Sequence, residues 1–126
     1  MNQKLVGSWS LVSFEIEDNE KKITSWGKDA HGLLIYADSG RMSVSINKTV
    51  ENDSENEMEN IFDSILFYSG TYKIEGNLIK HQVTEASNPT RIGREMLRYA
   101  EFIGDTVRLV TPQESFGRAI LVWKKI

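Results

Sequence analysis

The fold of this chain is decided by the stretch Gly32-Leu33-Leu34-Ile35-Tyr36-Ala37-Asp38-Ser39-Gly40-Arg41-Met42-Ser43-Val44-Ser45-Ile46-Asn47. The bulky apolar residues of its first half are typical of a strand. A short polar residue followed by glycine, as in Ser39-Gly40, favours the positive φ of a hairpin turn. In the second half apolar and polar residues alternate, so Met42, Val44 and Ile46 share one face. The stretch therefore predicts an antiparallel hairpin with one buried face.

The same rhythm continues along the chain. Strands are predicted over residues 5–16, 32–37, 41–47, 67–75, 78–85, 93–102, 106–111 and 118–124, with a less certain stretch up to Trp26. Sequential antiparallel strands leave two exposed edges, and closure into a barrel removes both. A barrel of about eight strands has room for packed side chains or for one small ligand. We predict an all-β, eight-stranded, antiparallel up-and-down barrel in a single domain, residues 1–126.

One segment has the pattern of a helix instead. Ser54 and Glu57 form a capping-box pattern, in which each side chain satisfies a free backbone donor near the other. The apolar residues that follow recur at helical spacing; they are Met58, Ile61, Phe62, Ile65 and Leu66. This pattern predicts one short amphipathic helix at about 55–66. We prefer the interpretation that its apolar stripe plugs one end of the barrel over the alternative that it forms a lid above a ligand mouth.

Composition excludes several classes of function. The formal net charge of −3 and the pI near 5.4 argue against a nucleic-acid partner, which requires a concentrated basic surface. The absence of cysteine excludes disulfides and thiolate chemistry. The first residues lack the apolar run of a signal peptide, and no stretch approaches the ~20 apolar residues of a membrane helix. We therefore expect a cytoplasmic protein without a membrane partner.

The sequence offers little for a metal or a cofactor. It contains two histidines, and neither stands in a His-x-His or His-Glu-x-x-His pattern. A haem held by His81 alone is disfavoured. Gly-x-Ser-x-Gly elbows and glycine-rich phosphate loops are absent as well. We expect no metal and no cofactor.

His81 is the strongest candidate for a functional residue. It alternates with Ile79 and Val83, so its side chain should point inward, where a buried imidazole needs hydrogen-bond partners. Tyr72 is the expected neighbour, because the two residues lie at similar distances from the turn Gly76-Asn77. The predicted cluster is either a self-satisfied polar group inside the barrel or a polar anchor for a ligand.

Arg98 should point into the barrel from the following strand. A buried guanidinium without a counter-charge is costly, so it requires either a protein acid, such as Glu85 or Glu95, or a bound anion. In the second case Arg98 would supply the charge that holds a ligand carboxylate or carbonyl next to His81.

Several motifs, in this order, resemble those of bacterial and fungal lipocalin-like domains. They are Leu5-Val6-Gly7-Ser8-Trp9-Ser10-Leu11-Val12-Ser13-Phe14-Glu15 (with the G-x-W signature), Gly32-Leu33-Leu34-Ile35-Tyr36, Gly40-Arg41-Met42-Ser43, Tyr68-Ser69-Gly70-Thr71-Tyr72, His81-Gln82-Val83, Asn88-Pro89, Arg98 and Leu121-Val122-Trp123-Lys124. The resemblance covers nearly the whole chain. It implies an antiparallel barrel and a small apolar ligand, although a few barrels of this general kind act as cyclases or isomerases.

The three tryptophans also have expected places, of which the resemblance supplies that of Trp9. Trp9 would close the narrow end of the barrel, with Trp123 as its neighbour because closure brings the first and last strands together. Arg118 or Lys124 could lie over one of these rings. Trp26 would be at the rim of the mouth.

Three hypotheses for function follow. The first is a binding module for a small, mainly apolar ligand that possesses a carboxylate or carbonyl. Its candidate binding residues are Tyr36, Met42, Val44, Tyr72, His81, Met96 and Arg98, with Val107 as further lining. The second is a cyclase or isomerase with His81 as general acid or base and Tyr72 as donor to an oxyanion. The third is a filled barrel that acts through its surface or as a homodimer. We favour the binding module.

Overall fold

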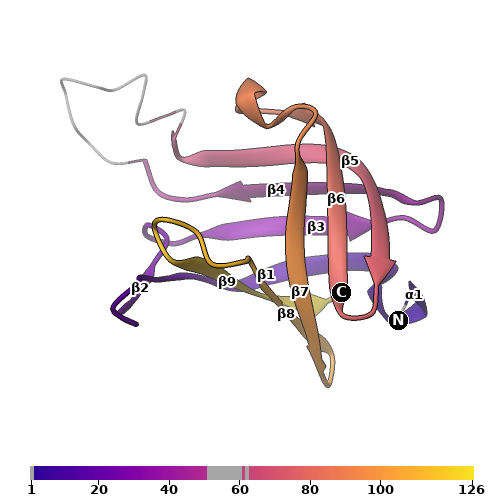
Figure 1. Ribbon diagram of the computed structural model, residues 1–126, viewed down its shortest axis with the longest axis horizontal. Helices are drawn as coiled ribbons and strands as arrows, with labels where there is room; N and C mark the ends of the chain where they lie inside the picture. Colours follow the sequence, from indigo (N-terminus) through magenta and orange to yellow (C-terminus); the bar gives the residue numbers. More distant parts are fainter. Residues whose placement is uncertain (1, 51–60, 62) are drawn as a thin grey trace.

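A computed structural model describes residues 2–50, 61 and 63–126, and it shows these residues as one closed barrel (Figure 1). The elements are α1 (Asn2–Leu5), β1 (Gly7–Glu17), β2 (Ile23–Ser25), β3 (His31–Tyr36), β4 (Arg41–Asn47), β5 (Ile65–Glu75), β6 (Leu78–Ala86), the 3₁₀ turn η1 (Pro89–Arg91), β7 (Glu95–Ile103), β8 (Thr106–Val110) and β9 (Arg118–Lys125). Neighbours in the sheet follow the order β2-β1-β3-β4-β5-β6-β7-β8-β9, and β1 also pairs with β9. The eight strands β1 and β3–β9 therefore form the predicted barrel. The short β2 pairs only with the end of β1.

Most predicted strands differ from the observed ones by one or two residues at an end, and two of these differences place residues in another element. Leu5 belongs to α1 and not to the first strand. Ile65 and Leu66, assigned to the predicted helix, begin β5 because they pair with Asn47 and Ile46 of β4. Ser64 ends the preceding turn, since its Oγ and its backbone N–H both donate to the carbonyl of Ile61. The rest of the predicted helix, residues 55–60 and 62, lies outside the described residues.

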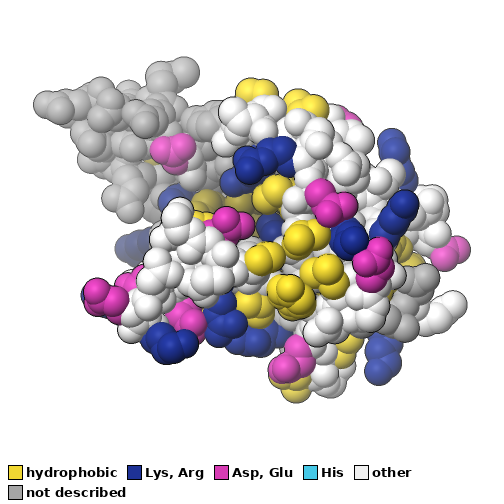
Figure 2. Space-filling view, in the orientation of Figure 1, with side chains coloured by type: hydrophobic (Ala, Val, Ile, Leu, Met, Phe, Trp, Pro, Cys, Tyr) yellow, Lys and Arg dark blue, Asp and Glu magenta, His cyan; other side chains and the backbone are white. Residues whose placement is uncertain are grey.

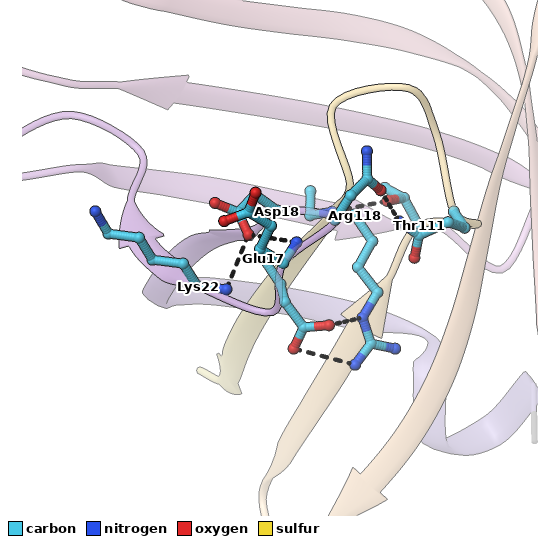
Figure 3. Close-up of polar contacts among 9 residues, drawn as sticks. Glu17, Asp18, Lys22, Thr111 and Arg118 are labelled. Atoms are coloured by element: carbon cyan, nitrogen blue, oxygen red, sulfur yellow. Dashed lines mark hydrogen bonds and ion pairs between the residues drawn. The ribbon is translucent and has the colours of Figure 1, made fainter.

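The pairing of β1 with β9 closes the barrel. It runs from Trp9↔Lys125 to Glu17↔Arg118, with one irregularity between Leu11 and Ser13. At its far end Arg118 Nε donates to Glu17 Oε1 at 3.0 Å, which joins the two strands by an ion pair (Figure 3). Arg118 is therefore engaged here and does not lie over a tryptophan ring.

The narrow end of the barrel is sealed by the two ends of the chain. Trp9 is 2% exposed, and its Nε1–H donates to the carbonyl of Leu5 at 2.9 Å. Lys125 Nζ lies 4.7 Å from the centre of the Trp9 ring and donates to the carbonyls of Lys4 and Val6, at 3.0 and 2.6 Å. The cation over Trp9 is thus Lys125 and not Lys124. The expected position of Trp9 at a closed end follows from these contacts.

Replacement of Lys125 by methionine tests this seal. K125M removes the cation–π contact and leaves two carbonyls without their donor, so we expect the free energy of unfolding to fall by about 1–2 kcal/mol. K124M is the matched control, because Lys124 is exposed and makes only a surface ion pair with Asp105 at 3.9 Å. Urea unfolding of both variants measures the difference. Equal effects of the two substitutions would contradict the proposed seal.

Candidate functional site

An internal cavity lies between the barrel walls. All eight barrel strands contribute to its lining, which consists of Phe14, Leu34, Val44, Ile46, Leu66, Tyr68, His81, Arg98, Leu109, Ala119, Leu121 and Trp123. The volume of this cavity is about 50 Å³. The interior is therefore largely filled by side chains, with a narrow space left beside one polar cluster.

The polar cluster consists of His81 held between two tyrosines. Tyr36 Oη lies 2.6 Å from Nε2 of His81, and Tyr68 Oη lies 2.6 Å from Nδ1. All three side chains are at most 2% exposed. Both ring nitrogens therefore have a partner, as a buried imidazole requires.

Strand alternation and one β-bulge place these groups. His81 and Val83 face inward along β6, but the register with β5 changes between Ser69 and Gly70, so that Gly70 faces Val83 while Ser69 faces Glu85. The extra residue on β6 turns Glu85 outward, where its Oε1 accepts a hydrogen bond from Ser69 at 3.0 Å. Gly70 permits this approach, because a Cβ there would lie 1.8 Å from the backbone oxygen of Gln82.

Arg98 has no carboxylate partner in the described part of the chain. Its Nη1 donates to the backbone carbonyl of Leu97 at 2.8 Å, while the guanidinium borders the cavity. The two acids suggested by the sequence, Glu85 and Glu95, are both exposed. The ion pairs among the described residues involve other cations, namely Lys80, Arg118 and Lys124. Neither of the two acids that the sequence suggested therefore pairs with Arg98.

Burial and the charge of Arg98 keep His81 neutral. Burial and, as the smaller cause, the nearby Arg98 guanidinium together lower the pKa of His81 from 6.5 to about 3. Burial also raises the pKa of both Tyr36 and Tyr68, against the opposing effect of Arg98. At neutral pH the cluster therefore consists of a neutral imidazole and two protonated hydroxyls.

The structure brings only some of the predicted site residues together. Val44, His81 and Arg98 line the cavity, and Tyr36 contacts it through His81. The other predicted residues, Met42, Tyr72, Met96 and Val107, do not line it. Tyr72 does pair with His81 across the sheet, but its hydroxyl donates to the carbonyl of Ala37 at 2.8 Å.

Sequence reasoning missed two polar wall residues. Tyr68 lies four residues before Tyr72 and therefore on the same face of the strand, which is the signal that could have found it. Trp123 is expected only as a neighbour of Trp9, and the structure shows that it lines the cavity. No pattern in the sequence marks it as a cavity residue.

A second cleft adjoins the cavity at Leu66. It is lined by Trp26, Lys48, Asp63, Ile65, Leu66, Ser87, Asn88 and Arg91. Trp26 stacks on Phe14 of the cavity wall, with ring centres 4.7 Å apart, and Lys48 Nζ lies 4.4 Å from the Trp26 ring. On the face drawn in Figure 2, hydrophobic and basic side chains meet around a hollow beside the grey residues. We interpret this cleft as the mouth of the barrel, with Trp26 at its rim as expected.

Two further observations limit the chemistry of the described residues. Among residues 2–50, 61 and 63–126, no three histidine or carboxylate side chains gather where they could hold a metal ion. Within the same ranges, no helix is both long and apolar enough to span a bilayer.

The closed barrel, with an apolar cavity and a buried polar cluster beside it, defines the class of small barrels to which lipocalins belong. The chain belongs to the lipocalin-like domain family, whose model matches residues 6–126. The search of curated proteins finds no match.

Solved structures show the same fold. A lipocalin-like protein from Bacteroides uniformis ATCC 8492 is 14% identical, with a TM-score of 0.55 over 98% of this chain and 99% of that one. An uncharacterized protein from Bacteroides eggerthii DSM 20697 is also 14% identical, with a TM-score of 0.53 over 97% and 99%. A redesigned β-barrel is 6% identical, with a TM-score of 0.53 over 99% and 94%. At these identities the likeness concerns the fold alone.

The buried histidine predicts a pH dependence of stability. The pKa of His81 in the folded chain, about 3, lies below its ordinary value of 6.5, so the unfolded chain takes up the proton first as the pH falls. The contribution of the neutral His81 ring to the free energy of unfolding is fully present above about pH 6.5. It is lost as the pH falls toward 3, at up to about 1.4 kcal/mol per pH unit.

Substitution of each histidine in turn isolates this contribution. We expect H81Q to be less stable at pH 7 and to lose less stability than the wild type between about pH 6.5 and pH 4. H31Q is the control, because His31 is exposed, and it should retain the wild-type slope. Urea unfolding at a series of pH values gives the slopes. An unchanged slope in H81Q would show that His81 does not carry this dependence.

Proposed function

We propose that this barrel binds a small, mainly apolar molecule in its cavity, with one polar end of the ligand directed at Tyr68 and Arg98. The observation that carries the proposal is the cavity itself, an apolar space walled by all eight barrel strands and containing a few polar groups. Binding sites for small molecules have this composition, because apolar walls supply affinity and a few placed polar groups fix orientation. Fold likeness supports the proposal only in general terms, since one fold serves many functions.

The size and position of the cavity limit the shape of ligand that fits. A cavity volume of about 50 Å³ accommodates only a few ligand atoms beside the polar cluster. The adjoining mouth shares Leu66 with the cavity and adds Trp26 and Arg91 to the path. A slim, elongated ligand fits this arrangement, with its polar end inside and its tail toward the mouth.

The state of His81 favours binding over acid–base catalysis by the imidazole. Both ring nitrogens are occupied by tyrosine hydroxyls, and the low pKa of the ring leaves it neutral at pH 7. Of the two tyrosines that bond to His81, Tyr68 lines the cavity and Tyr36 does not. A cyclase or isomerase activity, a homodimer and a cytoplasmic location all stay predictions.

A neutral fluorescent probe tests the proposed function. N-phenyl-1-naphthylamine should gain fluorescence on binding to the protein, and 1-hexanol should displace it. We expect A119L to weaken probe binding by about tenfold or more, because the larger side chain fills cavity space that ligand carbons would occupy. V12L is the matched control, since Val12 is an exposed residue on the outer face of β1.

Thermal unfolding of A119L and V12L shows whether the barrel remains intact. Weak probe binding by an A119L variant that keeps the wild-type unfolding temperature supports the cavity as the site. If neither the probe nor any alcohol of four to ten carbons binds the wild type, the binding proposal fails. The hypothesis of a filled barrel then remains. Equal binding by both variants would place the probe outside the cavity.

A further inference from the structure

We propose that the polar end of the cavity presents only hydrogen-bond donors and therefore selects ligands that end in a carboxylate. This inference rests on the ligand-binding function proposed above and adds the chemical class of the ligand. It also assigns a role to Tyr36, which lies outside the cavity lining. Three residues with hydrogen-bond donors border the cavity: Tyr68, Arg98 and Trp123.

The first step is a count of the protons on His81. A neutral imidazole has one N–H donor and one nitrogen acceptor. One tyrosine hydroxyl must therefore donate to the bare nitrogen, while the protonated nitrogen donates to the oxygen of the other tyrosine. The second hydroxyl keeps its own hydrogen, for which the described residues offer no other acceptor. Each tautomer of His81 thus leaves one tyrosine O–H without an acceptor among the described residues.

The second step decides which tyrosine has that free hydrogen. Tyr36 is fully buried and does not line the cavity, so a free O–H there would stay unsatisfied. Tyr68 lines the cavity, where water or a ligand can accept its hydrogen. Because a buried donor without an acceptor costs free energy, the favoured arrangement has Tyr36 donating to Nε2 and His81 Nδ1–H donating to Tyr68. Tyr68 then directs its O–H into the cavity.

The third step adds an independent donor. Trp123 is 1% exposed and lines the same cavity, and its Nε1–H has no hydrogen-bond partner among the described residues. Indole nitrogen is a donor only, so nothing but an acceptor satisfies it. A polar group of this kind, buried in a cavity wall, indicates an acceptor that occupies the cavity when the protein is loaded.

The fourth step concerns charge. The guanidinium of Arg98 has five N–H donors, of which one bonds to the carbonyl of Leu97. Its charge and that of Arg91 both act on Tyr68, and neither cation is paired with a carboxylate in the described part of the chain. Two positive charges near one buried hydroxyl, without a carboxylate partner among the described residues, favour an anion over a neutral acceptor.

The geometry of the space selects among anions. A carboxylate is planar, offers two acceptor oxygens and forms short, charge-assisted bonds with a guanidinium. Its compact size suits the narrow space beside the cluster. An alcohol satisfies fewer of these donors and brings no charge. An amine would add a donor and a positive charge where the protein already supplies both.

Tyr36 acts in this arrangement as a positioning residue. Its hydroxyl fixes the protonated nitrogen of His81 at Nδ1, and His81 in turn fixes Tyr68 as a donor to the ligand. Loss of the Tyr36 hydroxyl lets the imidazole adopt the other tautomer, in which Tyr68 donates to His81 and no longer to the cavity. Tyr36 thus controls ligand preference without contact with the ligand.

Binding of hexanoate, 1-hexanol and hexylamine tests the selected class, because these molecules share one chain length and differ in the head group. We expect hexanoate to bind at least about tenfold more tightly than 1-hexanol, and hexylamine to bind least. R98M should reduce the hexanoate:hexanol affinity ratio to near one, mainly because hexanoate binding weakens. R94M is the matched control, since Arg94 is exposed, and it should keep the wild-type ratio. Titration calorimetry of the intact chain supplies the affinities.

NMR tests the tautomer and the role of Trp123. The ¹⁵N shifts of His81 should show Nδ1 protonated and Nε2 bare. Hexanoate, and not hexanol, should move the Trp123 indole N–H signal strongly downfield. Y36F should change the ¹⁵N pattern of His81 and lower the hexanoate:hexanol ratio severalfold. Y72F is the control, because the Tyr72 hydroxyl bonds to Ala37 and not to His81, and it should preserve both.

The outcomes separate this inference from the proposed function. If none of the three compounds binds, the proposed function fails first. If hexanol binds as tightly as hexanoate, the binding function stands and the carboxylate class is overturned. The role of Tyr36 is overturned if Nδ1 of His81 is unprotonated in the wild type. It is also overturned if Y36F and Y72F have the same hexanoate:hexanol affinity ratio. A Trp123 signal that hexanoate leaves unmoved removes that donor from the site.

Discussion

The hydrogen-bonded pairing of β1 with β9 is the constraint on which the rest of the structure depends. Without it the sheet would be open, and its inward face would enclose no volume. With it that face encloses one cavity, which His81, Arg98 and Trp123 border from β6, β7 and β9. The same pairing sets the ion pair of Glu17 with Arg118 and the contact of Lys125 with Trp9. Closure thus creates both the site and the seal at its far end.

A single irregularity in β6 determines the electrostatics of that cavity. Regular alternation would turn Glu85 inward two residues after Val83, where a carboxylate could neutralise Arg98. The bulge opposite Ser69 and Gly70 turns Glu85 outward instead. The guanidinium keeps its charge available to the cavity, and that charge in turn helps to keep His81 neutral. Local backbone geometry on one strand therefore sets the charge that a ligand meets on another.

Sequence predicted the barrel well because its signals are local. Residues 41–47 alternate strictly and end at turn residues, and β4 has those bounds in the structure. The predicted helix overran into β5, because Ile65 and Leu66 suit an apolar helix stripe as well as a strand beside β4. The inward direction of His81 and its pairing with Tyr72 also followed from counting along the hairpin. The hydrogen bond between His81 and Tyr36 could not be predicted in this way, because Tyr36 comes from β3, which is not a neighbour of β6 in the sheet. Contacts across the interior depend on how strands tilt and stagger around the barrel, and no pairwise pattern in the sequence contains that information.

The position of the chain ends has a practical consequence. Both termini lie at the same end of the barrel (Figure 1), where Ile126 bonds to the backbone of Ser8 and Lys125 bonds to that of Lys4. The cleft beside Trp26 lies at the other end of the strands. A fluorescent reporter or an affinity tag joined to either terminus would therefore stand clear of the opening. The loops around Trp26 and Asn88 are the places where engineering would change the rate at which small molecules enter and leave.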